Sequence, residues 1–304
     1  MITIEQRAEF RKHFRNNISS RLVTDKIIKG IVFGCVIIAI VPLGSILLEV
    51  VRNGVPALSI DFFTQEPGAV GSDQPGGIGP AIQGTLMLIG MSSLIGVPVG
   101  VLGGIFLSEF GNNRFGHMIR FFNDVLAEFP TIVIGLFAFI MIVLTFGSFS
   151  ILAGTFALSI IMLPIITRTT EEALKLVPVT YREAGYALGI KRWVIITSIL
   201  LTSAKSGLIT GIMLSVARIG GETAPLIFTI LGSDQFFSGF DQPMDALPLR
   251  IWRLSLLPYD TATAQGWGAA LVLILIVLSL NIGVRYIFMR KRSGGGRFRI
   301  TAGG

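Results

Sequence analysis

The segment AIQGTLMLIGMSSLIGVPVGVLGGIFLS, residues 81–108, decides the fold class of this chain. It contains no charged residue and is rich in glycine. A helix needs about 20 apolar residues to cross the hydrocarbon core of a bilayer, because each residue advances it by about 1.5 Å. Only helices and closed barrels satisfy their backbone hydrogen bonds there. The segment is therefore predicted to span a membrane as a helix, and its glycines are predicted to let neighbouring helices approach closely.

Apolar segments of similar length lie on both sides of this one, at residues 28–49, 121–146, 150–167, 204–231 and 266–289. Between residues 28 and 289 no stretch is polar enough to form a separate soluble domain. The chain is therefore predicted to be an all-α integral membrane protein that crosses the bilayer about six times.

The composition agrees with a membrane protein, since 52% of the residues are hydrophobic and only 14% are charged. A soluble domain carries about one quarter charged residues. The net charge of +7 does not indicate nucleic acid, because the basic residues flank apolar segments, next to membrane lipid. Cys35 is the only cysteine, so the chain cannot form an intrachain disulfide or a cysteine-rich metal site.

Basic residues gather in alternate loops, which predicts the orientation of the chain in the membrane. Under the positive-inside rule these loops are cytoplasmic, and both termini are predicted to face the cytoplasm. The expected organisation is a cytoplasmic N-terminal segment 1–27, a transmembrane domain 28–289 with a cytoplasmic loop 168–203, and a cytoplasmic tail 290–304. In an outer loop, residues 246–257 are expected to form either an interfacial amphipathic helix or a packed loop.

The loop 168–203 has the features of a docking element rather than a plain connection. Pro178 can end one helix, and Thr180 with Glu183 has the spacing of a capping box for a second. Gly189 can close that second helix in a left-handed conformation. Apolar and aromatic residues along it could insert into a groove of a cytoplasmic partner. The alternative is a structured loop without a partner.

The same loop resembles the permease subunits of bacterial ABC importers. Their signature is E-A-A, three residues, G, nine residues, and I-x-L-P. Its positions here hold Glu183, Ala184, Gly185, Gly189, Ile199 and Leu201. The chain departs from the pattern where Gly185 replaces the second Ala and Thr202 replaces Pro. The resemblance implies a coupling helix that docks on an ATPase, formed by Tyr181, Arg182, Glu183, Ala184, Gly185 and Gly189.

Two further segments narrow the resemblance to the PstA-type family of phosphate permeases. These are RTTEEALKLVP at 168–178 and ARIGGETAPLIFT at 217–229. Ala224, Pro225 and Leu226 favour this family over the sister PstC-type permeases. The resemblance implies the type I ABC importer permease fold in a bacterial inner (cytoplasmic) membrane. It also implies a PstC-like second permease, two PstB-like ATPase subunits that bind ATP and Mg²⁺, and a PstS-like phosphate-binding protein. No cofactor is then expected in this chain.

Arg218 and Glu222 lie within the fifth apolar segment, where an ionised side chain is costly. Their spacing of four residues places them on one helix face, so they can form a structural ion pair. Arg218 can instead offer paired donors to a tetrahedral oxyanion in the pore, with Glu222 beside it. Arg168, at the inner end of the fourth segment, is either part of the same pathway or extends to lipid headgroups. Asp124 and Glu128 are expected to pair with Arg120 or to cap a helix.

Other functions explain fewer of these features. The chain lacks a GxxxxGK[ST] phosphate loop and the HExxH and GxSxG motifs, so neither ATP hydrolysis nor another enzymatic activity is expected in it. A secondary anion transporter would explain the spans and Arg218 but not the spacing in the loop. An ABC permease for another oxyanion, such as sulfate, molybdate or phosphonate, remains the alternative nearest to a phosphate permease.

Overall fold

The computed structural model describes residues 4–69 and 76–290, with side chains for 24–69 and 76–286. Most of the predicted tail 290–304 and the side chains of residues 1–23 lie outside this part of the chain. The described residues form helices joined by loops. The α-helices are α1 (Ile4–Gly54), α2 (Ile60–Thr64), α3 (Gly79–Glu109), α4 (Arg114–Glu128), α5 (Thr131–Ala138), α6 (Leu144–Phe146), α7 (Ile151–Lys175), α8 (Val179–Ala187), α9 (Arg192–Val194), α10 (Leu201–Gly220), α11 (Ala224–Thr229), α12 (Leu247–Ser255) and α13 (Asp260–Arg290).

Short irregular turns complete this set. A 3-10 turn, η1, covers Val55–Ala57. Two π-helical segments, η2 (Phe139–Val143) and η3 (Ile195–Leu200), join helices without a break. As a result α5, η2 and α6 form one continuous rod, and so do α9, η3 and α10.

The chain divides into a first unit, Met1–Arg52, and a second, Asn53–Gly304. The first unit is the long helix α1, whose span Thr24–Ala57 has a mean hydropathy of 2.8. Its large hydrophobic side chains are exposed from Ile27 to Leu48, as expected for a helix in lipid. Pro42 lies inside α1, and the helix continues past it without a break.

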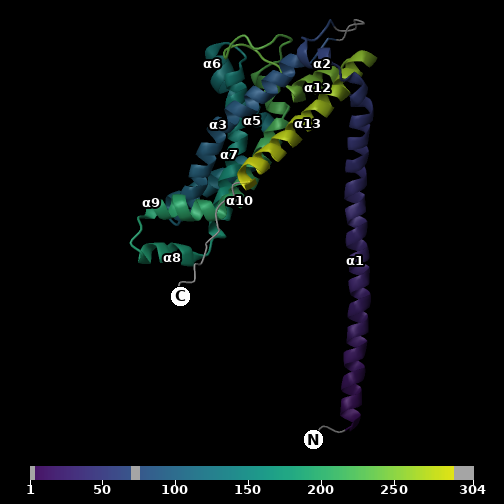
Figure 1. The fold of residues 1–304 in the computed structure, drawn as a ribbon, viewed down its shortest axis with the longest axis vertical. Coiled ribbons are helices and arrows are strands. Elements are labelled where there is room, and N and C mark those ends of the chain that lie inside the picture. The colour runs from purple at the N-terminus through teal and green to yellow at the C-terminus, as the bar shows by residue number, and fades with distance from the viewer. Residues whose placement is uncertain (1–3, 70–75, 291–304) are drawn as a thin grey trace, which may run out of the picture. The chain divides into compact units, whose positions relative to one another are not determined.

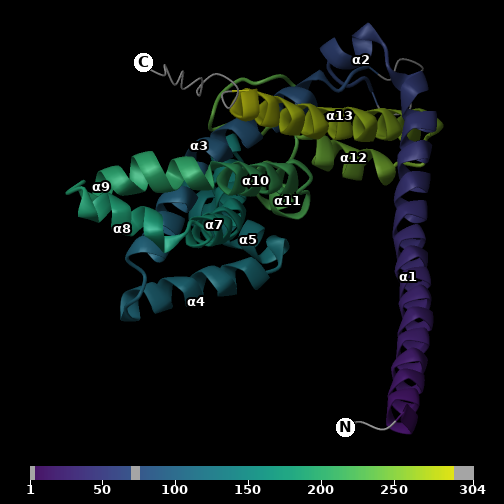
Figure 2. The ribbon, with the colours of Figure 1, turned by 60° about the horizontal axis from the view of Figure 1, so that its bottom comes forward.

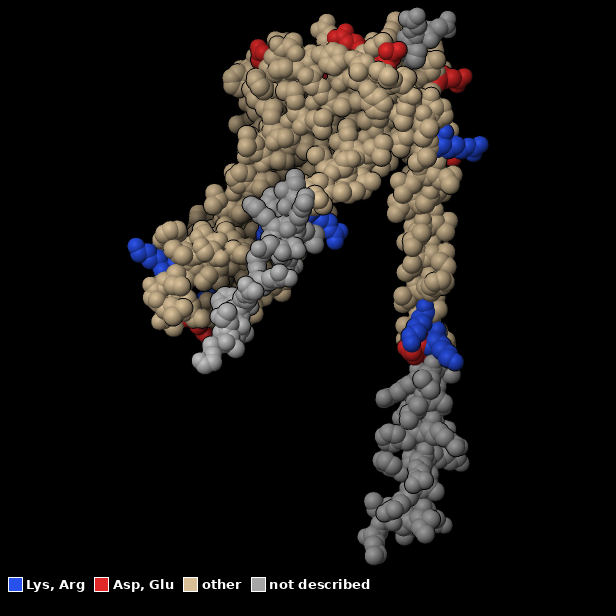
Figure 3. All heavy atoms as spheres, viewed as in Figure 1, with Lys and Arg blue, Asp and Glu red and all other residues tan. Residues whose placement is uncertain are grey.

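In the second unit α7 occupies the centre, in contact with α3, α4, α5, α10 and α11 (Figures 1 and 2). Sixteen residues along α7 are buried, so this helix is enclosed by protein rather than lipid. On the face shown in Figure 3, acidic side chains gather at the end of this unit that carries α2 and α12. The surface next to that end, toward the middle of the unit, is uncharged. That arrangement matches a bundle whose middle lies in hydrocarbon.

Three glycines of α3 bring it against α7. An ideal Cβ added to Gly96 would lie 3.1 Å from Cβ of Met162, and one added to Gly100 would lie 2.8 Å from Cβ of Ile166. At Gly104 the same atom would lie 2.5 Å from Cβ of Thr170. The glycines recur every four residues and so form one face of α3. The close helix approach predicted for them is confirmed.

Five helices among the described residues are long and apolar enough to cross a membrane, and up to six if a bent pair counts as one span. The bent pair corrects the prediction of a straight span at 121–146. The helix Arg114–Glu128 turns by 103° into Thr131–Phe146. Pro130 lies at the break and holds Phe129 in an extended conformation (φ −67°, ψ 133°). Residues 121–128 therefore belong to α4, a separate amphipathic helix.

The neighbouring spans also differ from their predicted bounds. The fourth continues as α7 to Lys175 instead of ending at 167, and the fifth begins at Arg192 instead of 204. The fifth ends at Gly220, before the separate helix α11. What was expected as a loop at 168–203 is therefore helical at both ends, and only the part around α8 lies outside the long helices.

Residues 246–257 form a packed helix, α12, which lies against α3 and α13. Its Arg250 is buried, with Nε 2.5 Å from Oδ2 of Asp245 and Nη2 2.7 Å from Oδ1 of Asp234. The two carboxylates neutralise the buried guanidinium and tie the preceding loop to α12. Trp252 and Leu256 remain exposed on the other side of the helix.

Candidate functional site

The predicted docking element is the helix α8 and its C-terminal cap. Gly189 has φ +69°, the left-handed conformation predicted for it. Its N–H donates to the carbonyl of Tyr186 at 2.9 Å, and the N–H of Ile190 donates to the carbonyl of Gly185 at 3.0 Å. These two bonds form a Schellman motif, which satisfies the last carbonyls of a short helix. The motif gives α8 a sharp, fixed end.

The start of α8 differs from the predicted capping box. Pro178 occupies the N-cap position, and Thr180 lies inside the first turn of the helix. No side chain caps this N-terminus. The Thr180–Glu183 pairing is therefore wrong, because Pro178, which fixes its own φ, begins the helix two residues earlier than expected.

Gly185 is one of the two departures from the E-A-A pattern. It is buried on the side of α8 that packs on η3, where an added Cβ would lie 2.8 Å from Cδ1 of Ile195. Tyr181, Glu183 and Ala184 of α8 are exposed, and Glu183 lies on the side of the helix opposite Gly185. The exposed aromatic and acidic groups are free to contact another protein.

Arg182 belongs to the buried side of the element rather than to its exposed side. Its Nη2 and Nε lie 2.7 and 3.1 Å from Oε1 of Glu109, the last residue of α3. Its remaining donors reach the carbonyls of Leu174 and Val177. The sequence signature places Arg182 among the coupling residues. In the structure its side chain points inward and contacts Glu109.

Arg218 lies in the last turn of α10, and Glu222 follows the end of that helix. The expected ion pair is present, with Nε of Arg218 3.5 Å from Oε1 of Glu222. This separation is too long for a good charge-assisted hydrogen bond, which spans about 2.7–2.9 Å. Arg218 is 49% exposed, and among the described residues no hydrogen bond holds its guanidinium group. Its donors are therefore available to another ligand.

The guanidinium group of Arg168 has more partners than that of Arg218. Its Nε donates to Oε1 of Glu172 at 2.7 Å, and its Nη1 lies 3.4 Å from Oδ1 of Asp124. Asp124 was expected to pair with Arg120 or to cap a helix, and both alternatives are wrong, because Asp124 lies inside α4 and faces Arg168. Arg120 instead bonds Glu171 at 2.8 Å, because the bend at Pro130 lays α4 beside the end of α7.

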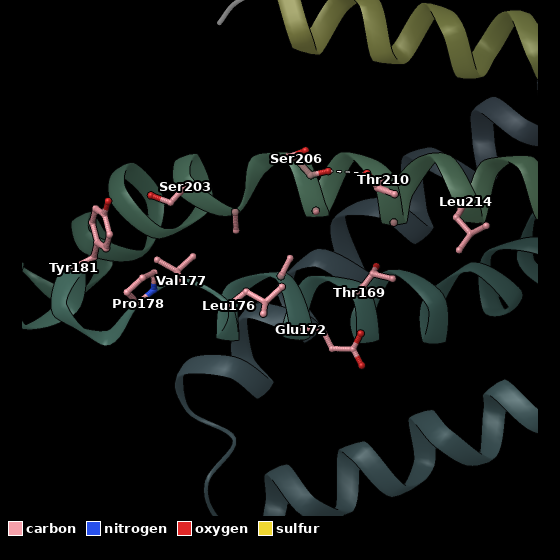
Figure 4. A pocket seen from close by; sticks show the side chains of 14 residues that line it. Thr169, Glu172, Leu176, Val177, Pro178, Tyr181, Ser203, Ser206, Thr210 and Leu214 are labelled. Carbon is pink, nitrogen blue, oxygen red and sulfur yellow. Dashed lines mark hydrogen bonds between the residues drawn. The ribbon is translucent and has the colours of Figure 1, made fainter. Parts of the chain in front are cut away.

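A groove of about 570 Å³ lies between the end of α7 and the start of α10 (Figure 4). Ser203, Ser206 and Thr210 line its α10 wall, and Glu172 and Tyr181 contribute from the other side. The Thr210 hydroxyl donates to the backbone carbonyl of Ser206 at 2.8 Å. Ser206, Thr210, Leu214 and Arg218 recur every four residues along α10. All of them are exposed in the chain by itself, so one face of α10 connects the groove to Arg218.

Lipid is a poor neighbour for this face of α10, since it carries hydroxyls and an arginine. The exposed positions of α3 and α5, by contrast, include Leu94, Val99, Leu136 and Phe137. Another protein chain or a water-filled pathway would satisfy these polar groups. The hydroxyl residues were not selected from the sequence, where they appear only as interruptions of an apolar segment.

The chain matches a known family over residues 96–293, the binding-protein-dependent transport system inner membrane component. The phosphate transport system permease protein PstA of Haemophilus influenzae is 42% identical over 274 residues, covering 90% of this chain and 96% of that protein. The probable phosphate transport system permease protein PstA of Methanocaldococcus jannaschii is 39% identical, covering 88% of this chain and 94% of that protein.

Solved structures share the fold at low sequence identity. One is a bacterial alginate ABC transporter in complex with an alginate pentasaccharide-bound periplasmic protein, with a TM-score of 0.66 at 14% identity over 91% of this chain and 99% of that one. Another is the inward-facing MetNI methionine ABC transporter, with a TM-score of 0.56 at 19% identity over 69% of this chain and 92% of that one.

The fold and these matches define an inner-membrane permease subunit of the type I ABC importer class, which works with ATPase and binding-protein partners. Within that class, the chain belongs to the PstA family of phosphate transport permeases.

Proposed function

We propose that this chain is the permease subunit of an ATP-driven importer of inorganic phosphate and forms half of its translocation pathway. The observation that carries the proposal is Arg218, half-exposed at the end of a polar face of α10 and without a hydrogen bond among the described residues. A planar guanidinium with free paired donors suits a tetrahedral oxyanion. The names of the PstA relatives favour phosphate as that anion.

Glu222 serves as a competing partner for Arg218. Because the ion pair is long, phosphate oxygens can displace the carboxylate at low cost. The carboxylate then repels the bound anion, which favours its release further along α10. Arg168 is a secondary candidate for the pathway, because Glu172 and Asp124 already neutralise it.

Helix α8 serves as the coupling helix, and its exposed residues dock on a separate ATPase. Exposed Tyr181, Tyr186 and Leu188 provide apolar surface, and exposed Glu183 provides a negative charge. ATP and Mg²⁺ bind to the ATPase, and this chain contributes no catalytic group. Closure of two ATPase subunits draws the coupling helices together and opens the pathway outward, and hydrolysis resets it.

The proposed assembly follows from the PstA relationship. It contains this chain, a PstC-like permease, two PstB-like ATPase subunits and a PstS-like phosphate-binding protein outside the membrane. The end of the second unit with α8 then faces the cytoplasm, and both termini are cytoplasmic. The basic residues around α8 agree with that orientation.

Anion competition tests the substrate. Proteoliposomes containing the complete complex are loaded with ATP at the cytoplasmic face, and uptake of radiolabelled phosphate is measured with excess sulfate, molybdate or phosphonate. We expect unlabelled phosphate alone to suppress the signal. Equal suppression by one of the other anions would contradict selectivity for phosphate, because the complex would then accept both anions.

A further inference from the structure

Glu109 is an isolated acidic residue at the end of a long uncharged helix, and its side chain is only 5% exposed. A buried carboxylate is costly unless it is paired and hydrogen-bonded. The partner is Arg182 of α8, which donates twice to the same carboxylate oxygen, from Nη2 at 2.7 Å and from Nε at 3.1 Å. The two residues are 73 positions apart, so the pair fixes α8 to a helix distant in the sequence.

Arg182 also joins α8 to the segment that leads into it. Its Nη1 donates to the carbonyl of Val177 and its Nη2 to that of Leu174, each at 3.1 Å. Its side chain is 18% exposed. One guanidinium group therefore holds together the ends of α3 and α7 and the start of α8, and few of its donors remain for an external partner.

A second arginine fastens the other end of the same segment. Nη2 of Arg192, which follows the cap of α8, donates to the backbone carbonyl of Glu109. Its guanidinium carbon lies 4.0 Å from the centroid of the Phe110 ring, in cation–π geometry. Both ends of the α8 segment are thus attached to the last residues of α3.

Helix α3 is in turn locked to α7 by the glycine contacts at Gly96, Gly100 and Gly104. Packed interfaces of this kind move as units instead of deforming continuously. A displacement of α8 is therefore passed to the α3–α7 pair instead of being absorbed by a flexible loop.

We propose that Glu109 and Arg182 form a strut that transmits movement of α8 to α3 and α7, an inference that rests on the proposed coupling role of α8. Glu109 is buried and bonds Arg182, so its proposed role is that of a positioning residue that acts through Arg182. Without the strut, α8 still docks on the ATPase, but its displacement no longer moves the membrane helices together.

The test compares transport with hydrolysis in the reconstituted complex. Phosphate taken up per ATP hydrolysed is measured for the wild type, Glu109→Gln, Arg182→Gln and the exchanged pair Glu109→Arg with Arg182→Glu. We expect each single variant to retain bound ATPase and hydrolysis while the ratio falls about tenfold, within the usual range for coupling between sites. The exchanged pair should recover part of the ratio. Arg114→Gln, at the exposed start of α4, is the control and should leave it unchanged.

An unchanged ratio in an assembled Glu109→Gln complex would overturn the strut. If that variant does not assemble, the same ratio is measured for Arg182→Lys, which keeps the positive charge but lacks the paired, planar donors of arginine. An unchanged ratio there also overturns the strut. Failure of the wild-type complex to import phosphate with ATP would instead contradict the proposed function, so the two ideas are tested separately.

Discussion

Gly185 of α8 packs against Ile195 of η3 so closely that an added Cβ would lie 2.8 Å from the isoleucine Cδ1 atom. This contact sets how α8 sits on the helix that continues into α10. It leaves little room for a larger side chain at position 185.

Gly185→Ala is expected to be tolerated, and Gly185→Val is not. Alanine favours the helix by about 1 kcal/mol, which offsets a contact that a small shift of the Ile195 side chain relieves. Valine adds two further methyl groups and is expected to cost about 2 kcal/mol or more through overpacking. Thermal unfolding in detergent and ATP-dependent uptake measure both effects. Equal stability of the two variants would contradict the packing of α8 on η3.

Glu183→Lys is expected to weaken docking of the ATPase without affecting the fold of the permease. Glu183 is exposed on α8, and reversing its charge places a cation in the proposed interface. Copurification of the ATPase with the permease measures the effect. Glu128→Lys, an exposed reversal at the end of α4, is the matched control. Undiminished copurification by Glu183→Lys would remove this residue from the interface.

Arg218→Gln is expected to lower the uptake rate at limiting phosphate about tenfold to hundredfold, the loss typical of one hydrogen bond to a charged group. Arg218→Lys should fall between this variant and the wild type, because it keeps the charge but loses the paired donors. Assembly of the complex should not change, since no hydrogen bond among the described residues holds Arg218. Normal uptake by Arg218→Gln would exclude a pathway role.

Gly104→Ala is expected to destabilise the bundle by about 1–3 kcal/mol through overpacking. The added Cβ would lie 2.5 Å from Cβ of Thr170 and 2.7 Å from the backbone oxygen of Thr167, and a backbone atom cannot turn aside. Gly90→Ala, on the same helix with nothing within 4 Å, is the control. Thermal unfolding in detergent should separate the two variants, and equal midpoints would argue against close packing of α3 on α7.

Most of the bundle could be predicted from the sequence, because apolar length alone identifies membrane spans. The error at 121–146 arose because hydropathy does not register a bend. Pro130 looks compatible with the start of a span, yet it turns the chain by 103° and leaves α4 outside it. The extension of α7 to Lys175 was missed because its charged last turns appear too polar for a span. Glu171 there is neutralised by Arg120 and Lys175.

The candidate site was only partly predictable. The Arg218–Glu222 pair follows from helical spacing, and the left-handed cap follows from Gly189. The inward turn of Arg182 could not be predicted, because its partner Glu109 is distant in sequence and stands alone at a helix end. Ion pairs between residues far apart in sequence produce no local periodic pattern, so the sequence alone does not reveal them.

Arg250→Met is expected to destabilise the loop that precedes α12, and more so at neutral than at acid pH. Burial raises the pKa of the Asp245 carboxyl, and the guanidinium groups of Arg250 and Arg253 oppose that rise. A carboxyl whose pKa is raised in the folded protein stabilises the fold at pH values below its ordinary pKa. That stabilisation is lost as the pH rises through the folded-state pKa. Removing Arg250 raises the pKa further, so the stability lost relative to wild type should grow between about pH 5 and about pH 8.

Thermal unfolding at both pH values measures this dependence. Adding Asp245→Asn to Arg250→Met should abolish it, because no buried carboxyl then titrates. A pH dependence that persists in the double variant would assign it to another group.

The central claim is that α8 links the membrane helices to a separate ATPase that drives phosphate import. The most direct measurement is phosphate entry into liposomes containing the reconstituted permeases, ATPases and binding protein, with ATP present or absent. The account predicts entry only with hydrolysable ATP and with the ATPase bound. Equal entry without ATP, or from liposomes that lack the ATPase, would contradict it.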